Sequence, residues 1–210
     1  MFSFWLRPIG YELVMLLSDR DIKKAREAGE ISLEPFELSL LQPCSVDLRL
    51  GDRFLLFRRN SRDAIDVKEP IDDLMDEIII GKEDSFVLHP GEFVLASTIE
   101  KVGLSPSIAA QINGKSSLGR IGIIVHATAG FIDPGNTLCP TLELNNIGKL
   151  PVRLYWKMPI AQVTFMRLSS PAERPYGSKG LNSKYYGDEG PHASKMYLNF
   201  KSTEPGANSQ

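Results

Sequence analysis

Residues 114–143 read GKSSLGRIGIIVHATAGFIDPGNTLCPTLE, and the remainder of the chain is arranged around this stretch. It begins with a polar turn that contains Lys115, passes through an acidic turn around Asp133, and ends with Glu143 between two leucines. Cations, hydroxyls and backbone amides suit a phosphate, and a turn aspartate can accept hydrogen bonds from a sugar. A carboxylate among apolar residues is a candidate acid or base. The stretch therefore contains the parts of a nucleotide pocket.

Each of these parts also has a plain structural alternative. The string GKSS is a weak signal alone, because basic surface turns look the same and the glycine spacing of a Walker A loop is absent. Asp133 lies in an Asp-Pro-Gly sequence, which is a good turn by itself. Glu143 has the alternative of being an exposed strand residue, which is the usual state of a glutamate.

Other polar residues are expected to be structural. Asp47, in an alternating segment, is interpreted as a solvated or interface strand residue, since aspartates are rarely buried. Cys139 is interpreted as a buried strand residue. The three histidines do not form a ligand set and are interpreted as structural or exposed; they are His89, His126 and His192.

Composition and charge narrow the class of protein. A chain of 210 residues, 42% hydrophobic and 24% charged, is expected to form one soluble domain with a substantial core. Its net charge of -2 argues against a general nucleic-acid surface, so any anion site is local. The two cysteines, Cys44 and Cys139, indicate neither a disulfide framework nor a zinc cluster and favour a reducing cytoplasm. No apolar run approaches the roughly 20 residues that span a bilayer.

The pattern of short segments predicts an all-β fold. Strands are expected at 45–50, 53–58, 85–88, 92–98, 108–112, 152–155 and 160–165, with a strand-like apolar run at 121–125 and with Gly51-Asp52 as a turn between the first two. Residues 60–84 are expected to be a polar surface excursion with weak helical character. One helix is expected to begin after Ser18 and to stop at Gly29. Short strands, frequent Pro and Gly turns and few helices indicate a sandwich or jelly-roll-like barrel.

The ends of the chain differ from its middle. Residues 1–14 are expected to be an N-terminal extension. One interpretation is that Met15 is the ancestral start, and the other is that these residues are an added strand or arm that packs on a neighbouring subunit. Residues 15–170 form the β domain. After residue 169 Pro, Gly, Ser, Lys and Tyr dominate, as in a mobile segment. Residues 201–210 are expected to be a disordered tail.

Several motifs carry a family resemblance. GKSSLGR, HATAGFIDPG and TLEL, at their spacings, resemble the deoxycytidine triphosphate (dCTP) deaminase branch of the trimeric deoxyuridine triphosphatase (dUTPase) superfamily. The resemblance extends from LLSDRDI near residue 16, through QPCSVDLRL, to GSKGLNSKYYG and GPHAS near residue 190. It implies a distorted jelly-roll barrel with few short helices and a homotrimer with active sites between subunits. It also implies that residues 171–200 form a lid over a bound triphosphate.

The resemblance implies a zinc-independent deamination. Water attacks C4 of cytosine, with Glu143 as the acid and base and with Ser116 and Arg120 near the water. The zinc signature of cytidine deaminases, H-x-E with P-C-x-x-C, is absent. The substrate-binding residues that the resemblance implies are Lys115, Ser116, Ser117, Leu118, Gly119, Arg120, Asp133, Thr141, Leu142, Glu143, Gln162, Tyr176 and Lys184.

A short difference within the family concerns the number of reactions. Monofunctional deaminases of this family typically carry a motif such as TAHRIDPG, whereas the dUMP-forming enzymes carry a motif such as TAGFIDPG. This chain has Gly130-Phe131 and so resembles the dUMP-forming branch. Glycine frees space and backbone, which would let a second water reach the α-phosphate. The expected products are then dUMP, ammonia and diphosphate, with Mg²⁺ held through the substrate phosphates. The alternatives are a deaminase that releases dUTP, a dUTPase only, or a non-catalytic nucleotide-binding regulator.

The chain also departs from the family pattern. Residues 136–138 read Asn-Thr-Leu where an aromatic residue and Ser-Gly are usual, and Pro140 replaces a β-branched strand residue. Residues 157–160 replace a glycine-containing turn. In the lid, Asp188 stands where the family has a glutamine that contacts phosphate, and a carboxylate there would repel a triphosphate unless a cation intervenes.

Overall fold

The computed structural model describes residues 15–58, 62–128 and 130–201. The expectations for the extension at 1–14 and for the tail beyond residue 201 lie outside these ranges. No helix of the described part of the chain is long and apolar enough to cross a membrane.

Short strands make up most of the secondary structure, which confirms the all-β prediction. Within these ranges lie two α-helices, α1 (Asp19–Glu27) and α2 (Ser116–Gly119), and three 3₁₀ helices, η1 (Leu38–Leu40), η2 (Asp72–Leu74) and η3 (Met196–Asn199). The strands are β1 (Met15–Leu16), β2 (Ile31–Glu34), β3 (Leu41–Gln42), β4 (Ser45–Phe57), β5 (Met75–Ile79), β6 (Ser85–Leu88), β7 (Phe93–Thr98), β8 (Lys101–Leu104), β9 (Ile108–Gly114), β10 (Ile123–Ile124), β11 (Phe131–Ile132), β12 (Thr137–Leu138), β13 (Thr141–Asn146), β14 (Val152–Tyr155) and β15 (Pro159–Arg167).

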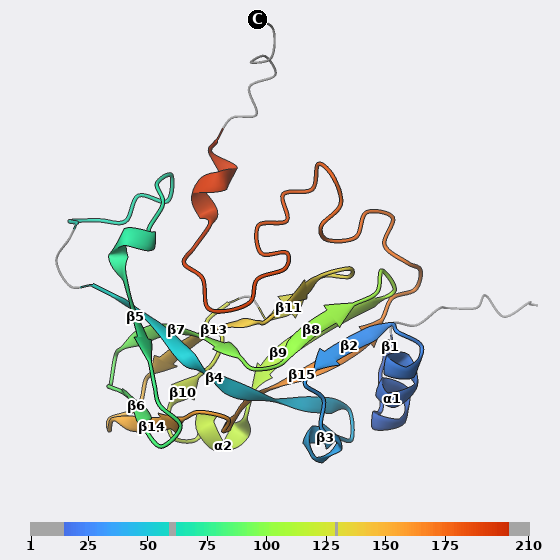
Figure 1. Ribbon diagram of the computed structural model, residues 1–210, viewed down its shortest axis with the longest axis horizontal. Coiled ribbons are helices and arrows are strands. Elements are labelled where there is room, and N and C mark those ends of the chain that lie inside the picture. Colours follow the sequence, from blue (N-terminus) through green and yellow to red (C-terminus); the bar gives the residue numbers. More distant parts are fainter. Residues whose placement is uncertain (1–14, 59–61, 129, 202–210) are drawn as a thin grey trace, which may run out of the picture.

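The strands form three antiparallel sheets around one main core (Figure 1). The ten-stranded sheet has the central order β10-β13-β7-β4-β15-β9-β11, with β1 on β15 and both β3 and β5 on β4. The smaller sheets are β12-β8-β2 and β14-β6. Buried side chains of all three sheets meet in a single hydrophobic cluster, so the large sheet curls around a shared interior rather than lying flat.

Strand β4 corrects the predicted hairpin at Gly51-Asp52. Instead of turning, the chain continues as one strand that pairs with β15 up to Arg49 and with β7 from Leu50 onward. A Cβ at Gly51 would lie 3.0 Å from the Ser97 carbonyl oxygen. Glycine therefore serves the close approach of β4 to β7, and not a reversal of the chain.

A buried ion pair holds the point where β4 changes partners. The Glu100 side chain is 1% exposed, and it accepts hydrogen bonds from Arg49 Nε at 2.6 Å and from the Arg49 backbone N–H at 2.7 Å. The Arg49 carbonyl in turn accepts from the Ile99 N–H at 2.9 Å. These bonds satisfy polar groups that the change of partners would otherwise leave unpaired in the interior.

The excursion after β4 is partly a strand, which corrects the predicted surface loop. Its expected helical part is limited to the single turn η2, and β5 then pairs with β4 from Met75 to Ile79. Ile71, Leu74 and Met75 form a second small core that also contains Ala193 from the C-terminal segment. The excursion and the C-terminal segment therefore pack together (Figure 1).

The remaining predictions at the ends of elements have mixed outcomes. Ser18 is the N-cap of α1, with its Oγ accepting from the Asp21 N–H at 3.4 Å, and Gly29 ends the helix region with φ of +72°, both as predicted. The apolar run 121–125 contributes only the two-residue strand β10.

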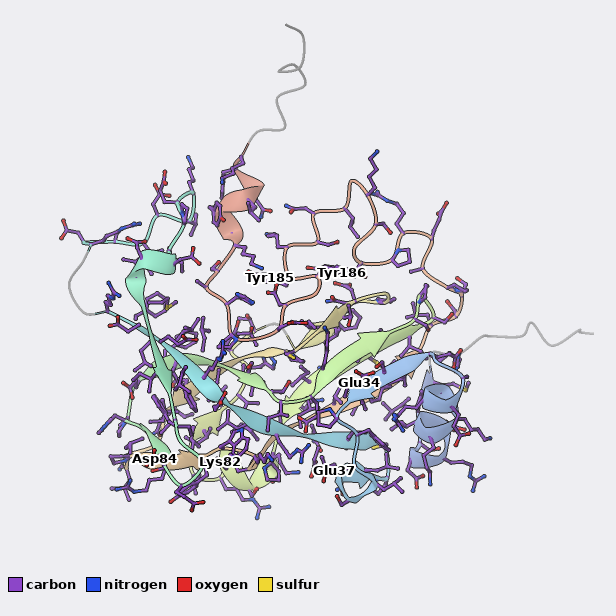
Figure 2. The ribbon with its side chains drawn as sticks, in the orientation of Figure 1. Glu34, Glu37, Lys82, Asp84, Tyr185 and Tyr186 are labelled. Carbon is purple, nitrogen blue, oxygen red and sulfur yellow. The ribbon has the colours of Figure 1, made fainter. Side chains whose placement is uncertain are left out.

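Residues 169–200 cross one end of the sheet without strands, and Tyr185 lies in this covering segment (Figure 2).

Replacing Glu100 with glutamine is expected to lower the free energy of unfolding by about 3 kcal/mol, because Arg49 keeps its buried charge and loses the buried one of its two charged partners, while the half-exposed Glu37 remains. The measurement is urea denaturation at a fixed protein concentration. Glu77→Gln is the matched control, since the Arg53–Glu77 pair is 3.9 Å long with both side chains about half exposed, and a change below about 1 kcal/mol is expected there. Equal effects of the two substitutions would contradict this role of Glu100.

Candidate active site

Strand β13 presents alternate side chains to two environments. Leu142 and Leu144 are fully buried in the core, whereas Thr141 and Glu143 point to the opposite face. The strand is held in register by β7, with Glu143 opposite Leu95. The leucines that flank Glu143 therefore fix its position by packing on the other side of the sheet.

Backbone amides hold the Glu143 carboxylate. Its Oε2 accepts hydrogen bonds from the N–H groups of Ala127 at 2.9 Å and Thr128 at 3.3 Å. The Glu143 N–H donates to the Val125 carbonyl at 3.0 Å. The 125–128 segment is therefore hydrogen-bonded to both the backbone and the side chain of Glu143. A carboxylate fixed in this way keeps the position that a candidate acid or base requires.

A cavity of about 590 Å³, called here the larger cavity, lies in front of Glu143. It gathers five sequence-predicted residues from different elements, namely Phe131, Asp133, Thr141, Glu143 and Tyr176. Its apolar wall comes from strands β4, β5 and β7 and from the excursion, and no motif had indicated these residues: Phe57, Ile65, Ile71, Met75, Phe93 and Leu95. A flat apolar base and a polar sugar both find suitable surroundings there.

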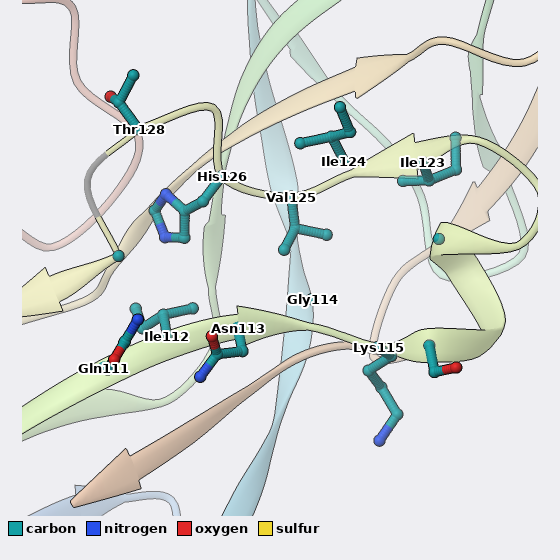
Figure 3. Close-up of a pocket in the computed structure, with 13 residues that line it drawn as sticks. Gln111, Ile112, Asn113, Gly114, Lys115, Ile123, Ile124, Val125, His126 and Thr128 are labelled. Carbon is teal, nitrogen blue, oxygen red and sulfur yellow. The ribbon is translucent and has the colours of Figure 1, made fainter.

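A second cavity of about 410 Å³, called here the smaller cavity, lies between β9 and the 123–128 segment (Figure 3). It is lined by Lys115, Ser116, Gly119 and Gly130 among the sequence-predicted residues. The cation, the hydroxyl and the backbone of α2 give this cavity the chemistry of a phosphate site.

His126 lies at the boundary between the larger and the smaller cavity, because it lines both of them, as Ile112 also does. In Figure 3 its ring lies between the 125–128 segment and β9. Both ring nitrogens are buried and have no hydrogen-bond partner among the described residues. Burial lowers the pKa of His126, and the negative charge of Glu143 opposes part of this shift. Sequence reasoning underrated this residue, although it stands one position before the amides that hold Glu143.

Asp47 is mostly buried, which corrects the expectation of a solvated strand residue. Its side chain is 11% exposed and forms an ion pair with Lys115, with Nζ and Oδ1 2.6 Å apart. The neighbouring strands explain the contact, since Asp47 on β4 lies opposite Gln162 on β15, and β9 on the far side of β15 leads directly into Lys115. Asp47 therefore orients the cation of the phosphate-like site and is not a solvated strand residue.

Other sequence-predicted residues lie outside both cavity linings as the described residues define them. Ser117 and Arg120 are exposed on and after α2, while Leu118 and Leu142 are buried. Gln162 accepts a hydrogen bond from the Ser45 hydroxyl at 3.4 Å. Lys184 belongs to the C-terminal segment, where its carbonyl accepts from Lys195.

The C-terminal segment is attached to the site through the main chain. The Tyr176 N–H donates to the Pro134 carbonyl at 2.8 Å, and the Gly187 N–H donates to the Thr137 carbonyl at 2.7 Å. The Cys139 N–H donates to the Asp188 carbonyl at 2.7 Å. These bonds place the segment over the larger cavity.

Gly130 lies against the backbone of β9, and its expected part in admitting a second water stays a prediction. A Cβ there would lie 2.5 Å from the Ile112 carbonyl oxygen, and the Ile112 N–H donates to the Gly130 carbonyl at 2.7 Å. The room that glycine leaves is occupied by the backbone of β9. Gly130 therefore supplies a close backbone path in front of Phe131.

Comparisons with known proteins show the family to which the chain belongs. The dCTP deaminase-like family model matches residues 16–168, and the chain belongs to this family. It is 50% identical over 186 residues to the "dCTP deaminase, dUMP-forming" of Corynebacterium glutamicum, which spans 89% of this chain and 98% of that protein. The identity to the protein of the same name from Bifidobacterium longum is 52% over 186 residues, or 89% and 96% of the two chains.

A solved structure shows the same fold. The crystal structure of a 2′-deoxycytidine 5′-triphosphate deaminase from Agrobacterium tumefaciens aligns with a TM-score of 0.59 and 22% identity, covering 74% of this chain and 49% of that one. The prediction of a β fold in the dCTP deaminase family is thus confirmed.

His126 is expected to make stability depend on pH. Its pKa in the folded chain is lowered from 6.5, so as pH falls through about 6.5 the unfolded chain binds a proton that the folded chain does not. The free energy of unfolding then decreases as pH falls toward the folded pKa, by at most about 1.4 kcal/mol per pH unit. Urea denaturation of wild type and His126→Gln between pH 8 and pH 5 measures this, and the variant should lack that part of the slope. Parallel curves would contradict it.

Proposed function

We propose that this protein is a dUMP-forming dCTP deaminase that converts dCTP to dUMP, ammonia and diphosphate. The observation that carries the proposal is Glu143, whose carboxylate is fixed by two backbone N–H groups at the wall of a cavity that also holds Asp133 and Tyr176. The close similarity to proteins of that name supports it. Both cysteines are free, and we place the enzyme in a reducing cytoplasm.

Glu143 can perform the proton transfers of deamination in sequence. Its Oε2 is held by the amides of Ala127 and Thr128, so Oε1 is the oxygen proposed to take the proton of the attacking water. As the water oxygen bonds to C4 of cytosine, the carboxyl passes this proton to N3. The carboxylate then takes the proton of the new C4 hydroxyl and gives it to the 4-amino group, so the C4–N bond breaks, ammonia leaves and C4=O forms. Asp133 would accept a hydrogen bond from the sugar, and the wall around Phe93 would exclude water from the base.

The phosphates are proposed to bind at α2. Lys115, oriented by Asp47, and the Ser116 hydroxyl both line the smaller cavity and offer a cation and a donor to phosphate oxygens. When bound with the triphosphate, Mg²⁺ would offset phosphate charge in the second hydrolysis. Lys115 and Ser116 fit this arrangement, because they would donate hydrogen bonds to the phosphate oxygens, while the substrate phosphates would hold the Mg²⁺ ion.

One chain distributes the reactive groups over two places. Glu143 and Asp133 line the larger cavity, whereas Lys115 and Ser116 line the smaller one and Arg120 is exposed beyond them. We therefore propose a homotrimer in which α2 of one subunit completes the larger cavity of a neighbour. In such a ring each site would need residues of two chains.

Incubation of the wild type with dCTP and Mg²⁺ is expected to give dUMP and diphosphate without accumulation of dUTP, as measured by chromatography. Glu143→Gln should lower kcat by at least about 100-fold, because it removes the acid and base, while its circular dichroism spectrum stays unchanged. Accumulated dUTP would identify a monofunctional deaminase, and cleavage of dUTP alone a dUTPase. Binding without turnover would indicate a regulator, and an active Glu143→Gln would exclude the proposed role of this residue.

Shared sites are tested by mixing two inactive variants, Glu143→Gln and Arg120→Gln, under conditions that exchange subunits. About a quarter of wild-type activity should return, because in a closed ring only interfaces that join an intact α2 to an intact Glu143 can work. Sedimentation should give a mass near three times the 23.4 kDa of one chain. No recovery in a mixture that has exchanged subunits, or a monomer mass, would overturn the shared site.

A further inference from the structure

The larger cavity contains a carboxylate that the proposed reaction does not use. Asp188 lines it together with Glu143, Asp133 and Tyr176, and its side chain is only 10% exposed. Its backbone carbonyl is fixed by the Cys139 N–H at 2.7 Å, so the residue is held at this wall. A buried negative charge in the cavity of a nucleoside triphosphate would repel the phosphates unless a cation compensates it.

Lys195 provides such a cation. Its Nζ lies 2.9 Å from Oδ1 and 3.2 Å from Oδ2 of Asp188, and it also donates to the Lys184 carbonyl at 3.1 Å. The Nζ is 5.3 Å from the centre of the Tyr185 ring. The Lys195 N–H donates to the Tyr185 hydroxyl at 3.1 Å. Several independent contacts therefore hold this ammonium group beside both oxygens of Asp188.

The same cluster is connected to the rest of the site. The Tyr185 N–H donates to the hydroxyl of Tyr176 at 3.2 Å, and Tyr176 lines the larger cavity. His192 Nε2 lies 3.9 Å from Asp188 Oδ2 and is the other titratable group next to that carboxylate. The neighbouring Glu189 points elsewhere and forms a 2.9 Å ion pair with Lys101.

We propose that Lys195 is a positioning residue for triphosphate binding, because it neutralises Asp188 on the wall of the larger cavity, to which α2 of the neighbouring subunit would bring the phosphates of dCTP. This inference rests on the proposed function. Affinity should then depend on the balance of the Asp188–Lys195 pair and not on either residue alone. The dependence should be specific to ligands with a high negative charge, since the base and sugar meet other parts of the wall.

The test is a double-mutant cycle read by calorimetric binding of dCTP in the Glu143→Gln background, with all variants measured at the same pH. Lys195→Met should weaken dCTP binding by roughly 10- to 100-fold, because an uncompensated carboxylate remains near the phosphates. Adding Asp188→Asn should restore affinity to within a few-fold of the parent, and Lys195→Arg should bind like the parent. The loss should decrease at high salt.

Two controls separate this effect from a loss of packing. Lys101→Met removes a similar charge from the exposed Lys101–Glu189 pair and should leave dCTP affinity unchanged. Binding of uncharged deoxycytidine should be unaffected by Lys195→Met. If Lys195→Met weakens deoxycytidine and dCTP equally, or if Asp188→Asn fails to restore dCTP binding, the compensation is refuted. If the wild type neither binds nor converts dCTP, the proposed function itself fails, and this inference with it.

Discussion

The change of partners along β4 is the constraint on which the rest of the structure depends. A strand shared by β15 on one part and β7 on another must turn its polar backbone groups toward two different neighbours within a few residues. Arg49 and the buried Glu100 satisfy those groups where the change occurs. Because β7 carries β13 and β15 carries β9, this junction sets how the two walls of the site face each other.

The site itself is built mostly from backbone. The amides of Ala127 and Thr128 hold Glu143, and Gly130 brings the same loop against the carbonyl of Ile112. Charged side chains are held in place by ion pairs, as Lys115 is by Asp47. A site of this kind keeps its donors at fixed positions, which is what stabilisation of developing charge requires.

The sequence was informative where a local pattern decides the structure. The residue types of 114–143 indicated the parts of a nucleotide pocket, of which Asp133 and Glu143 do line one cavity, and the motifs identified the family. Contacts between distant elements could not be predicted, because a pairing such as Asp47 with Lys115 follows from strand order. The same reason explains Gly51, since only the neighbouring β7 decides whether this glycine turns or continues a strand.

The attachment of the C-terminal segment has a consequence for how such a protein can change over time. Main-chain bonds at Pro134, Thr137 and Cys139 fix the path of the segment, and these bonds do not depend on which side chains it carries. Substitutions can therefore alter the charge that faces the cavity while the cover keeps its course. A family built in this way can diversify its ligand affinity without redesigning its architecture.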